Sequence, residues 1–544
     1  MMTVFEYHDR TRHHLHRTAA GPGYLDWASM PAPFRRYAGA PVVELPREAR
    51  TLRPHVPFDA LYDGNAVPSA SPDLCSIGSF LRCSLGLSAW KQAGGERWAL
   101  RVNPSSGNLH PTEGYVVAGP GVVEGGPGVY HYAADVHALE CRCRIGVEDW
   151  RGWAGRLPDG AFLVGLASIA WREAWKYGER AYRYCQHDMG HAVASLRYSA
   201  ALIGWDLAML HAWSDPAIAA LLGLDQAPRD AEREDPGCLL LVAPSAIDRR
   251  ALPGESAELI RAAGRGSWLG AASRLSPTHE HEWPILDEVA RAATKTAAPA
   301  ENPYPTPFSL SGAGTAPAIV RAVDARQVIL SRRSAVAFDD GAGPLPFGDF
   351  LRMMDRLLPR AMPPWDALSW PPAIHLAIFV HKVRDLAPGL YTLVREPGAL
   401  ADLRAATRKD FAWEHVERAG DVPLYYLAGG DTRALAAYVS CGQAIAGDGA
   451  FSLGMLARFA GPIADYGEWF YRCLFWEAGA VGQVLYLEAE AAGVRGTGIG
   501  CYFDPAVHEV LGLSDDRFQS LYHFTVGTPI EDVRLQTRPG YDWD

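Results

Sequence analysis

The stretch Tyr177-Gly178-Glu179-Arg180-Ala181-Tyr182-Arg183 decides how this chain is organised, because much of it returns as Tyr466-Gly467-Glu468-Trp469-Phe470-Tyr471-Arg472. The offset of 289 residues holds as far as 224 and 513, and about 15 of the 48 aligned positions are identical, where chance gives about three. The matches include Gly190 with Gly479, Gly204 with Gly493, and residues 215–217 with 504–506. A period this long predicts two related domains; the alternative is two unrelated helices that share a Gly-rich start.

The composition is that of a globular protein, with 544 residues of which 48% are hydrophobic and 21% charged. A net charge of −11 disfavours nucleic acid or an acidic membrane as partner. The nine cysteines lack paired spacing, and we find no signal-like N-terminus or membrane-spanning run, so we expect a cytoplasmic protein. His13, His14 and His16 lack a completing carboxylate or thiol, so we expect a solvated arm and no metal site.

Shifts in composition divide the chain into four parts. Residues 1–50, rich in His, Arg and Pro, are expected to form an extended arm, and residues 51–255 a first domain. Residues 256–320 are rich in Ala, Pro, Ser and Thr, as is typical of a linker, and residues 321–544 form a second domain.

Hydrophobic periodicity predicts similar elements in both domains. In the first we expect helices at 74–90 and 182–203 and strands at 114–118, 129–132, 161–169 and 238–242. In the second we expect helices around 331–334, 347–358 and 470–492, strands at 375–380, 390–393, 422–428 and 521–526, and a Gly-rich turn at 496–500. This mixture favours an α+β fold. The repeated helix is apolar around much of its circumference, so its two copies are predicted to pack together as the core of a pseudo-dimer.

Two short motifs have the chemistry of a binding site. Arg332-Arg333-Ser334 places two guanidinium groups and a hydroxyl close together, which suits a phosphate dianion. Pro104-Ser105-Ser106-Gly107-Asn108 offers backbone donors and small hydroxyls that can approach a flat polar ring. Alone, each signal is weak, since many helices carry Arg-Arg and such a loop is more often only a turn.

Together with the repeated helix, these motifs resemble the nitroreductase superfamily, FMN enzymes whose two flavin sites lie at a dimer interface. The first half looks most like the SagB-type dehydrogenases, the azoline oxidases of peptide natural-product pathways. The residues that carry this likeness are Tyr7-His8, Leu25-Asp26-Trp27, Pro33-Phe34, Tyr37, Arg101, Pro104 to Asn108, Pro111, Lys176 to Arg180 and Asp188 to His191. The resemblance covers most of residues 75–250 and 325–535. It implies an α+β fold of two nitroreductase-like domains, with mainly antiparallel sheets flanked by helices, fused as an intramolecular pseudo-dimer.

The resemblance distributes the family's site residues unequally between the two domains. The second domain supplies the phosphate-binding Arg332, Arg333 and Ser334, the ring-facing turn Gly498-Ile499-Gly500, and Arg534. The first supplies the loop residues Pro104, Ser105, Ser106 and Asn108. The reverse site is impaired, with Arg82-Cys83-Ser84 as its phosphate motif, Met209-Leu210-His211 as its turn, and Trp365 to Pro371 in place of the loop. We therefore expect one FMN per chain, between the domains.

The resemblance also implies a catalytic pair. SagB-type oxidases use a Lys-Tyr pair as acid and base, and it matches Lys176-Tyr177 here. An ammonium group close to a phenol lowers the pKa of the phenol. Tyr466 repeats Tyr177 without the lysine, so a purely structural role for this tyrosine stays open. His191 is expected either to line the site or to be a core histidine.

The function that the resemblance implies is FMN-dependent oxidoreduction, with hydride passing between the substrate and flavin N5. The enzyme would dehydrogenate a peptide-derived substrate, or would reduce nitro and quinone compounds with NAD(P)H bound transiently. No dinucleotide-binding fingerprint is present in the sequence. We expect a small-molecule or peptide-derived substrate as partner, and further dimerisation of the fused pair stays open. The alternative is a flavin-free scaffold or partner-binding subunit.

Overall fold

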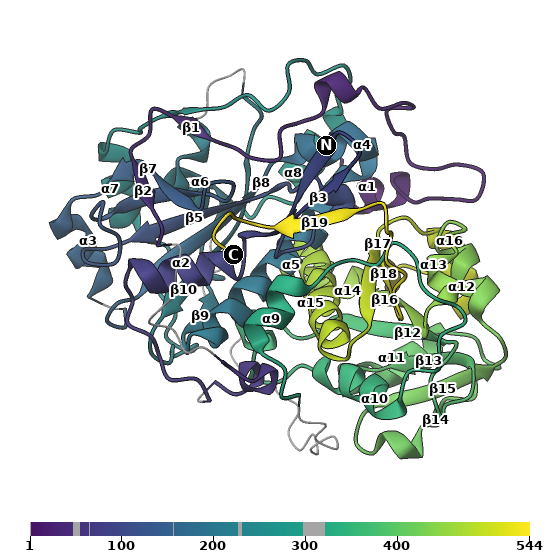
Figure 1. Ribbon diagram of the computed structural model, residues 1–544. Helices are drawn as coiled ribbons and strands as arrows, with labels where there is room; N and C mark the ends of the chain where they lie inside the picture. The colour runs from purple at the N-terminus through teal and green to yellow at the C-terminus, as the bar shows by residue number, and fades with distance from the viewer. Residues whose placement is uncertain (1, 47–54, 65, 156, 227–230, 298–320) are drawn as a thin grey trace.

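A computed structural model describes residues 2–46, 55–64, 66–155, 157–226, 231–297 and 321–544 (Figure 1). The end of the predicted linker, 298–320, and the start of the predicted first domain, 51–54, lie outside the described residues. The described chain forms two seven-stranded antiparallel sheets flanked by helices, one in each half. The predicted α+β fold with two domains is therefore confirmed.

The first sheet lies in the N-terminal half. Its strands, in spatial order, are β2 (Val42–Glu44), β7 (Ala138–Arg144), β6 (Gly128–Ala133), β5 (Thr112–Ala118), β8 (Phe162–Ser168), β10 (Asp235–Ala243) and β9 (Asp206–Met209). The four strands predicted in this half correspond to β5, β6, β8 and β10. Strands β5 and β8 are buried along their whole length, because helices cover the sheet.

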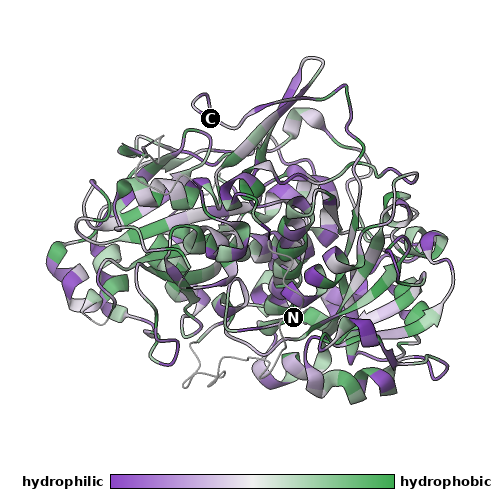
Figure 2. Cartoon of the chain, turned by 60° about the horizontal axis from the view of Figure 1, so that its bottom comes forward, coloured by the Kyte–Doolittle hydropathy of each residue, from purple (hydrophilic) through white to green (hydrophobic). Residues whose placement is uncertain are grey.

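The second sheet repeats the topology of the first. Its order is β14 (Glu414–His415), β15 (Leu424–Gly429), β13 (Gly389–Leu393), β12 (Ile374–Val380), β16 (Phe451–Arg458), β18 (Phe518–Gly527) and β17 (Arg495–Ile499). We leave aside the edge strands β2 and β14 and number the other six strands of each sheet by their order along the chain. Both sheets then have the same spatial order, 3-2-1-4-6-5. The duplication inferred from residue matches is thus visible in the order of the strands. Figure 2 shows hydrophobic residues concentrated in the strands of both halves.

The repeated helices meet at the centre of the molecule. Helices α5 (Ala181–Leu202) and α15 (Phe470–Ala491) pack against each other along their length (Figure 1), and almost all of their residues are buried. A Cβ atom on Gly190 would lie 2.1 Å from the Trp476 carbonyl oxygen, and one on Gly479 would lie 2.2 Å from that of His187. The matched glycines therefore mark the point where the two backbones come closest, as the predicted pseudo-dimer core requires.

Repeated charged residues join the halves in a reciprocal way. Arg183 pairs with Asp504 at 3.0 Å, and its repeat partner Arg472 pairs with Asp215 at 2.9 Å. Burial alone would raise the pKa of the Asp504 carboxyl, but Arg180 and Arg183 hold it well below its usual range. Removing one member of such a buried pair leaves the other charge uncompensated, at a cost of about 3–5 kcal/mol. The matched Tyr-Arg and Asp-Pro-Ala segments thus belong to the interface between the halves.

The N-terminal arm is packed against the protein instead of extended in solvent. It begins with helix α1 (Val4–Arg10), whose buried Tyr7 donates a hydrogen bond to the Glu179 carbonyl oxygen at 2.7 Å. Further along, the backbone N–H of His13 donates to the Asp504 carboxylate at 3.0 Å, and the His13 side chain is largely buried. The arm therefore contacts both halves, which the prediction of a solvated arm missed.

The predicted linker also contains folded structure. Its described part includes helices α7 (Ala257–Arg265) and α8 (Pro284–Ala292), and α8 packs against both α1 and α5. The ring of His279 stacks on Trp171 at a centroid distance of 4.0 Å. The segment predicted as a linker thus contains helices that pack on the rest of the protein. None of the helices in the described residues is long and apolar enough to cross a membrane.

The helix predicted for 74–90 is only half correct. Helix α2 (Leu74–Arg82) ends before Gly86, and strands β3 (Leu87–Ala93) and β4 (Glu96–Arg101) follow as a hairpin. Strand β19 (Gln536–Pro539), from the chain's C-terminal end, pairs with β3 and brings that end back to the first half (Figure 1). This pairing joins segments far apart in sequence, so local periodicity could not reveal it.

Two further local predictions were wrong in a way that affects the site. The Gly-rich segment 496–500 is mostly strand β17 rather than a turn, because it pairs with β18 from Arg495 to Ile499. The Arg332-Arg333-Ser334 motif does not lie on a helix. Helix α9 (Ala325–Ser331) ends just before it, and Arg332 is its C-terminal capping residue.

Candidate functional site

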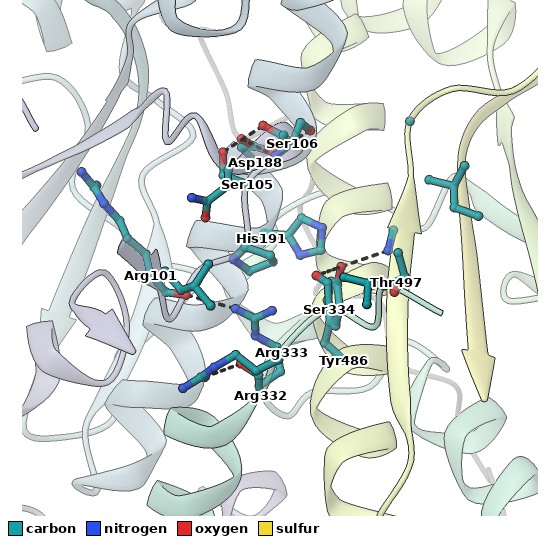
Figure 3. Close-up of a pocket in the computed structure, with 18 of the residues that line it drawn as sticks. Arg101, Ser105, Ser106, Asp188, His191, Arg332, Arg333, Ser334, Tyr486 and Thr497 are labelled. Carbon is teal, nitrogen blue, oxygen red and sulfur yellow. Dashed lines mark hydrogen bonds between the residues drawn. The ribbon is translucent and has the colours of Figure 1, made fainter. Parts of the chain in front are cut away.

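A cavity of about 440 Å³ lies between the two halves. The loop around Ser105 and Ser106 lines one end, and Arg332 and Arg333 line the other (Figure 3). Residues of β17 form part of its wall. Its volume is within the range of cavities that hold small molecules and cofactors. The cavity thus brings the two sequence motifs together from opposite halves.

The loop of Pro104, Ser105, Ser106 and Asn108 lines the cavity as predicted and is tied to helix α5. The backbone N–H and the hydroxyl of Ser106 both donate to the Asp188 carboxylate, at 3.0 and 3.1 Å (Figure 3). The Ser105 hydroxyl accepts a hydrogen bond from a backbone N–H at 2.7 Å, and the Asn108 amide donates to the Ala99 carbonyl oxygen at 2.8 Å. The loop is therefore held in one conformation before any ligand binds.

Two buried carboxyl groups lie behind this loop. Burial raises the pKa of Asp188 to about 7, although the hydrogen bonds from Ser105 and Ser106 act in the opposite direction. Burial and the neighbouring Asp188 raise the pKa of Glu173 well above its usual range. At neutral pH this pair therefore retains protons that exposed carboxyl groups would have lost.

The predicted pair Lys176 and Tyr177 lies directly over the loop, at the end of helix α4 (Ala170–Tyr177). A Cβ atom on Gly107 would lie 2.5 Å from the Tyr177 hydroxyl and 3.2 Å from Lys176 Nζ. Gly107 has φ of 58°, so both space and backbone conformation require glycine there. Tyr177 thus lines the loop end of the cavity, whereas Lys176 lies close to Gly107 but is not among the lining residues.

The prediction for the Tyr177 pKa was wrong in direction. Burial, followed by the charge of Glu173, raises the pKa of Tyr177 well above its usual value. Lys176 Nζ lies 5.2 Å from the centre of the Tyr177 ring, and this one ammonium group does not offset burial and the nearby carboxyl groups. Tyr177 is therefore a neutral phenol, suited to donating a proton rather than accepting one.

The opposite end of the cavity is cationic. Arg332 is buried, donates to the carbonyl oxygens of Arg101 and Val102 at 3.0 and 3.2 Å, and lies over the Tyr486 ring. Its Nε atom has no hydrogen-bond partner among the described residues. The Ser334 hydroxyl shares a hydrogen bond of 2.8 Å with the Tyr486 hydroxyl (Figure 3). A buried guanidinium with an unused donor is suited to receiving an anion.

Further cations surround this end. Burial and then the charge of Arg332 lower the pKa of Arg333 to about 10. Burial and Arg333 likewise lower the pKa of Lys91, whose ammonium donates to the Thr537 hydroxyl at 2.7 Å. Arg495 also lines this end and pairs with Glu531 at 2.6 Å. Burial is the larger cause of these lowered pKa values and repulsion between the cations is the smaller one, and a bound dianion would offset both.

The segment Gly498-Ile499-Gly500 lines the cavity, but its glycines serve a purpose the sequence did not suggest. A Cβ atom on Gly498 would lie 1.9 Å from the Tyr522 hydroxyl, and one on Gly500 would lie 2.3 Å from the Tyr184 ring. Both tyrosines line the cavity. The glycines therefore make room for aromatic side chains beside the strand, rather than only for a flat ligand.

Arg534 is the one predicted binding residue that the structure does not bring to the site. Its side chain is 84% exposed, pairs with Asp532 at 2.7 Å, and is not part of the cavity lining. His191 fits both of its predicted roles, because it lines the cavity and its ring nitrogens lie 3.2 Å from Gln483 and Tyr522.

Several lining residues were missed by sequence reasoning: Lys91, Trp98, Tyr184, Gln443, Tyr486, Arg495, Thr497, Cys501 and Tyr522. Lys91 and Trp98 lie on the β3–β4 hairpin, part of which was predicted as helix. The only local signal was position in the sequence, since Thr497 lies within the Gly-rich segment 496–500 and Arg495 and Cys501 flank it.

Comparisons with known proteins agree with this architecture. Residues 380–528 match the model of the nitroreductase family. A candidate nitroreductase from Anabaena variabilis ATCC 29413 has a crystal structure that matches 97% of this chain and 99% of its own, with a TM-score of 0.69 and 22% identity. The fold is that of a nitroreductase. The match spans both halves, so the predicted resemblance to this family is confirmed.

Two other solved structures match less than half of this chain, with lower TM-scores. A chain of the E. coli microcin synthetase McbBCD complex, solved with truncated pro-MccB17 bound, matches 45% of this nitroreductase-like chain and 92% of its own, at 18% identity and a TM-score of 0.26. A protein described as the oxidoreductase containing FMN matches 42% of this chain and 82% of its own, at 14% identity and a TM-score of 0.20. The search of curated proteins gives no match.

The internal repeat predicts a second, equivalent site, where Met209 and His211 take the places of Gly498 and Gly500. Side chains leave little space at this second site. The cavity there measures about 140 Å³ and is lined by Met209, His211 and Trp370 among others. Glu477 is the repeat partner of Asp188, but it accepts hydrogen bonds from Arg395 and from the Ala373 N–H instead of a serine loop. The space that remains is below the usual range for a cofactor.

The phosphate motif assigned to this second position must also be corrected. Helix α2, which carries Arg82, packs on α5 as α10 (Phe347–Arg356) packs on α15. The counterpart of α9 is instead the short helix η2 (Phe58–Tyr62), which contains no arginine. Arg82 pairs with Asp544 at 2.7 Å and lies over the Tyr541 ring. The second position of this nitroreductase fold therefore lacks the paired arginines that follow α9 at the first.

Proposed function

We propose that this protein is an FMN-dependent oxidoreductase with one flavin site, formed by both halves of the chain. The observation that carries the proposal is the polarity of the 440 Å³ cavity between the halves. Arg332 and its cationic neighbours lie at one end, and a pre-ordered Ser-Ser-Gly-Asn loop lies at the other. A ligand with a phosphate at one end and a flat polar ring at the other matches this arrangement.

The residues present fit FMN at each end. Arg332, Arg333 and Ser334, which line this end, would hold the phosphate through charge-assisted hydrogen bonds. Ser105 and Ser106, from the other half, would face the ring. When bound, the flavin supplies hydride acceptance and donation, and the protein supplies position and polarity.

Tyr177 is the proton donor we propose for this site. Its raised pKa keeps the hydroxyl protonated, and its hydroxyl lies against the loop that would face the ring. Once the proton has left, the Lys176 ammonium would stabilise the phenolate. Asp188 and Glu173 retain protons near neutral pH and would resupply the site. A neutral phenol suits the reduction of a nitro or quinone compound more directly than proton removal from an azoline, so the reductive direction is favoured.

The substrate class and location form part of the same proposal. Half-buried Trp98 and buried Tyr184 line the cavity and suit a flat small molecule or a peptide-derived heterocycle. NAD(P)H would bind transiently as electron donor. All nine cysteines are free thiols in the structure, which fits the reducing cytoplasm that we propose as its location.

The test has two anaerobic arms. Protein reduced by NADPH is mixed with a quinone or a nitroaromatic compound, and oxidised protein is mixed with an azoline peptide. We expect the visible absorbance of the oxidised flavin to bleach with NADPH and to return with the quinone or the nitro compound. Bleaching by the azoline peptide alone would assign the dehydrogenase direction instead. A colourless protein that rejects added FMN would contradict the proposal and leave a flavin-free scaffold.

A further inference from the structure

Cys441 and Cys501 lie unusually close together, although 60 residues separate them in sequence. Their sulfur atoms are 2.7 Å apart, not far above the disulfide bond length of about 2.0 Å. Cys441 lies between helices α12 (Arg433–Val439) and α13 (Ile445–Asp448), and Cys501 follows strand β17. The pair thus joins two separate segments of the second half.

The surrounding backbone fixes this arrangement. The Gln443 side chain donates to the Cys501 carbonyl oxygen at 3.0 Å, and the Phe503 N–H donates to the Val439 carbonyl oxygen at 2.8 Å. These bonds hold the two segments side by side on both sides of the sulfur atoms. Closing a bond between the sulfurs therefore requires little movement of the chain.

The environment distinguishes the two thiols. The hydrogen bond with Cys441 and then His13 lower the pKa of Cys501, against the effect of burial. The same contact raises the pKa of Cys441. The Nδ1 atom of His13 accepts a hydrogen bond from the Ala19 N–H at 3.0 Å, so its other ring nitrogen is free to donate to the Cys501 sulfur. Cys501 is thus the nucleophile of the pair and Cys441 the resolving thiol.

The pair can also be reached from outside. Cys441 and Cys501 are both partly exposed, whereas six of the other seven cysteines are buried. Cys501 lines the cavity between the halves, next to Gly500 and on the wall shared with Tyr184. A small reagent that enters the cavity therefore meets the Cys501 sulfur.

We propose that Cys441 and Cys501 form a redox-active dithiol, oxidised reversibly to a disulfide by low-molecular-weight disulfides of the glutathione type. The Cys501 thiolate attacks one sulfur of the small disulfide, forms a mixed disulfide and releases one thiolate. The Cys441 thiol then loses its proton, attacks Cys501 and releases the second small thiol. Two protein thiols and one small disulfide thus become one protein disulfide and two small thiols. The oxidised form would fasten the segment around Cys441 to the wall of the cavity.

The test is mass spectrometry of the purified full chain, with its cofactor as isolated, after treatment with oxidised glutathione and alkylation of the remaining thiols. We expect a peptide pair linked through Cys441 and Cys501 that separates on addition of dithiothreitol. Cys75, also partly exposed but outside such a pair, is the matched control and should form no intrachain link. Alkylation of Cys441 and Cys501 at the same rate as Cys75, with no linked peptide, would overturn the proposal.

Single variants test the order of events. In Cys441→Ser we expect a stable mixed disulfide between glutathione and Cys501, because the resolving thiol is missing. In Cys501→Ser we expect at least a tenfold slower modification of Cys441. Equal modification rates of the remaining thiol in the two variants would contradict the assigned roles. The readout is the mass of the polypeptide, so it can be taken on protein with and without bound flavin.

Discussion

Replacing Arg332 by alanine is the sharpest single perturbation of the proposed phosphate end. Arg332 is only 4% exposed, and its Nε atom has no partner among the described residues. The proposed flavin phosphate would receive a charge-assisted hydrogen bond from this buried guanidinium. Removing a hydrogen bond of this kind costs about 1.5–3 kcal/mol.

This energy converts directly to affinity. At about 1.4 kcal/mol for each factor of ten, the Arg332→Ala variant should bind FMN about 10- to 150-fold more weakly. Arg82→Ala is a matched control, because Arg82 is also 4% exposed but pairs with Asp544 and is not part of the cavity lining. The control should lose stability and keep its FMN affinity within about twofold, which is about 0.4 kcal/mol.

The assay is titration of the flavin-free protein with FMN, followed by the quenching of flavin fluorescence. Thermal unfolding of each variant checks that the titrated protein is folded. Equal losses of affinity in Arg332→Ala and Arg82→Ala would refute the assignment of Arg332 to the phosphate end. Unchanged affinity in both would refute it as well.

Three further predictions follow from the geometry. Tyr177→Phe should lower turnover about 100-fold or more, the usual contribution of a general acid, while FMN affinity stays unchanged; equal turnover would return Tyr177 to a structural role. Asp188 has its pKa raised to about 7 in the folded protein, so the folded state binds the extra proton, and stability should fall as pH rises from about 4 to 7. Asp188→Asn should remove this part of the slope in denaturant unfolding at several pH values, and an unchanged slope would contradict the shift. Gly479→Ala should lose at least about 1–3 kcal/mol by overpacking the helix crossing, whereas Gly461→Ala, which meets open space in helix α14 (Ala460–Tyr466), should be neutral or gain up to about 1 kcal/mol.

The architecture could be predicted from the sequence because the duplication preserved contacts between the halves. The matched residues Gly190 and Gly479 mark the helix crossing, and Arg183 and Arg472 form reciprocal ion pairs. Each of these residues contacts the other half through the same kind of interaction as its repeat partner, and both copies have the same residue type. The strands that were predicted are those with continuous apolar runs.

What could not be predicted depends on contacts between distant segments. The first part of strand β3 was read as helix although its hairpin partner β4 is adjacent in sequence. Its other partner, β19, begins at Gln536, more than 400 residues away, and gave no local signal. The pKa of Tyr177 was misjudged because its sequence neighbour Lys176 was visible, whereas the effects of burial and of Glu173 appear only in three dimensions. Arg534 was placed by resemblance, and the chain beyond β18 turns its side chain towards solvent.

Binding-site residues followed the same division. The Pro104–Asn108 loop and the Arg332–Ser334 motif were identified because each is a compact local pattern. Lining residues such as Tyr486 and Cys501 carry no local signal, since their role arises from the helix and strand that present them. The sequence predicted that the two composite sites differ. Only the structure identified η2 as the counterpart of helix α9, because η2 packs on α5 as α9 packs on α15.

The central claim is that a single flavin site is shared by two unlike halves. The most direct measurement is the amount of FMN released by denaturing a known amount of pure, flavin-saturated protein. The account predicts one FMN for each chain, and none after Arg332 and Arg333 are both replaced. Two FMN molecules for each chain would contradict it, since the 140 Å³ position would then have to hold a cofactor.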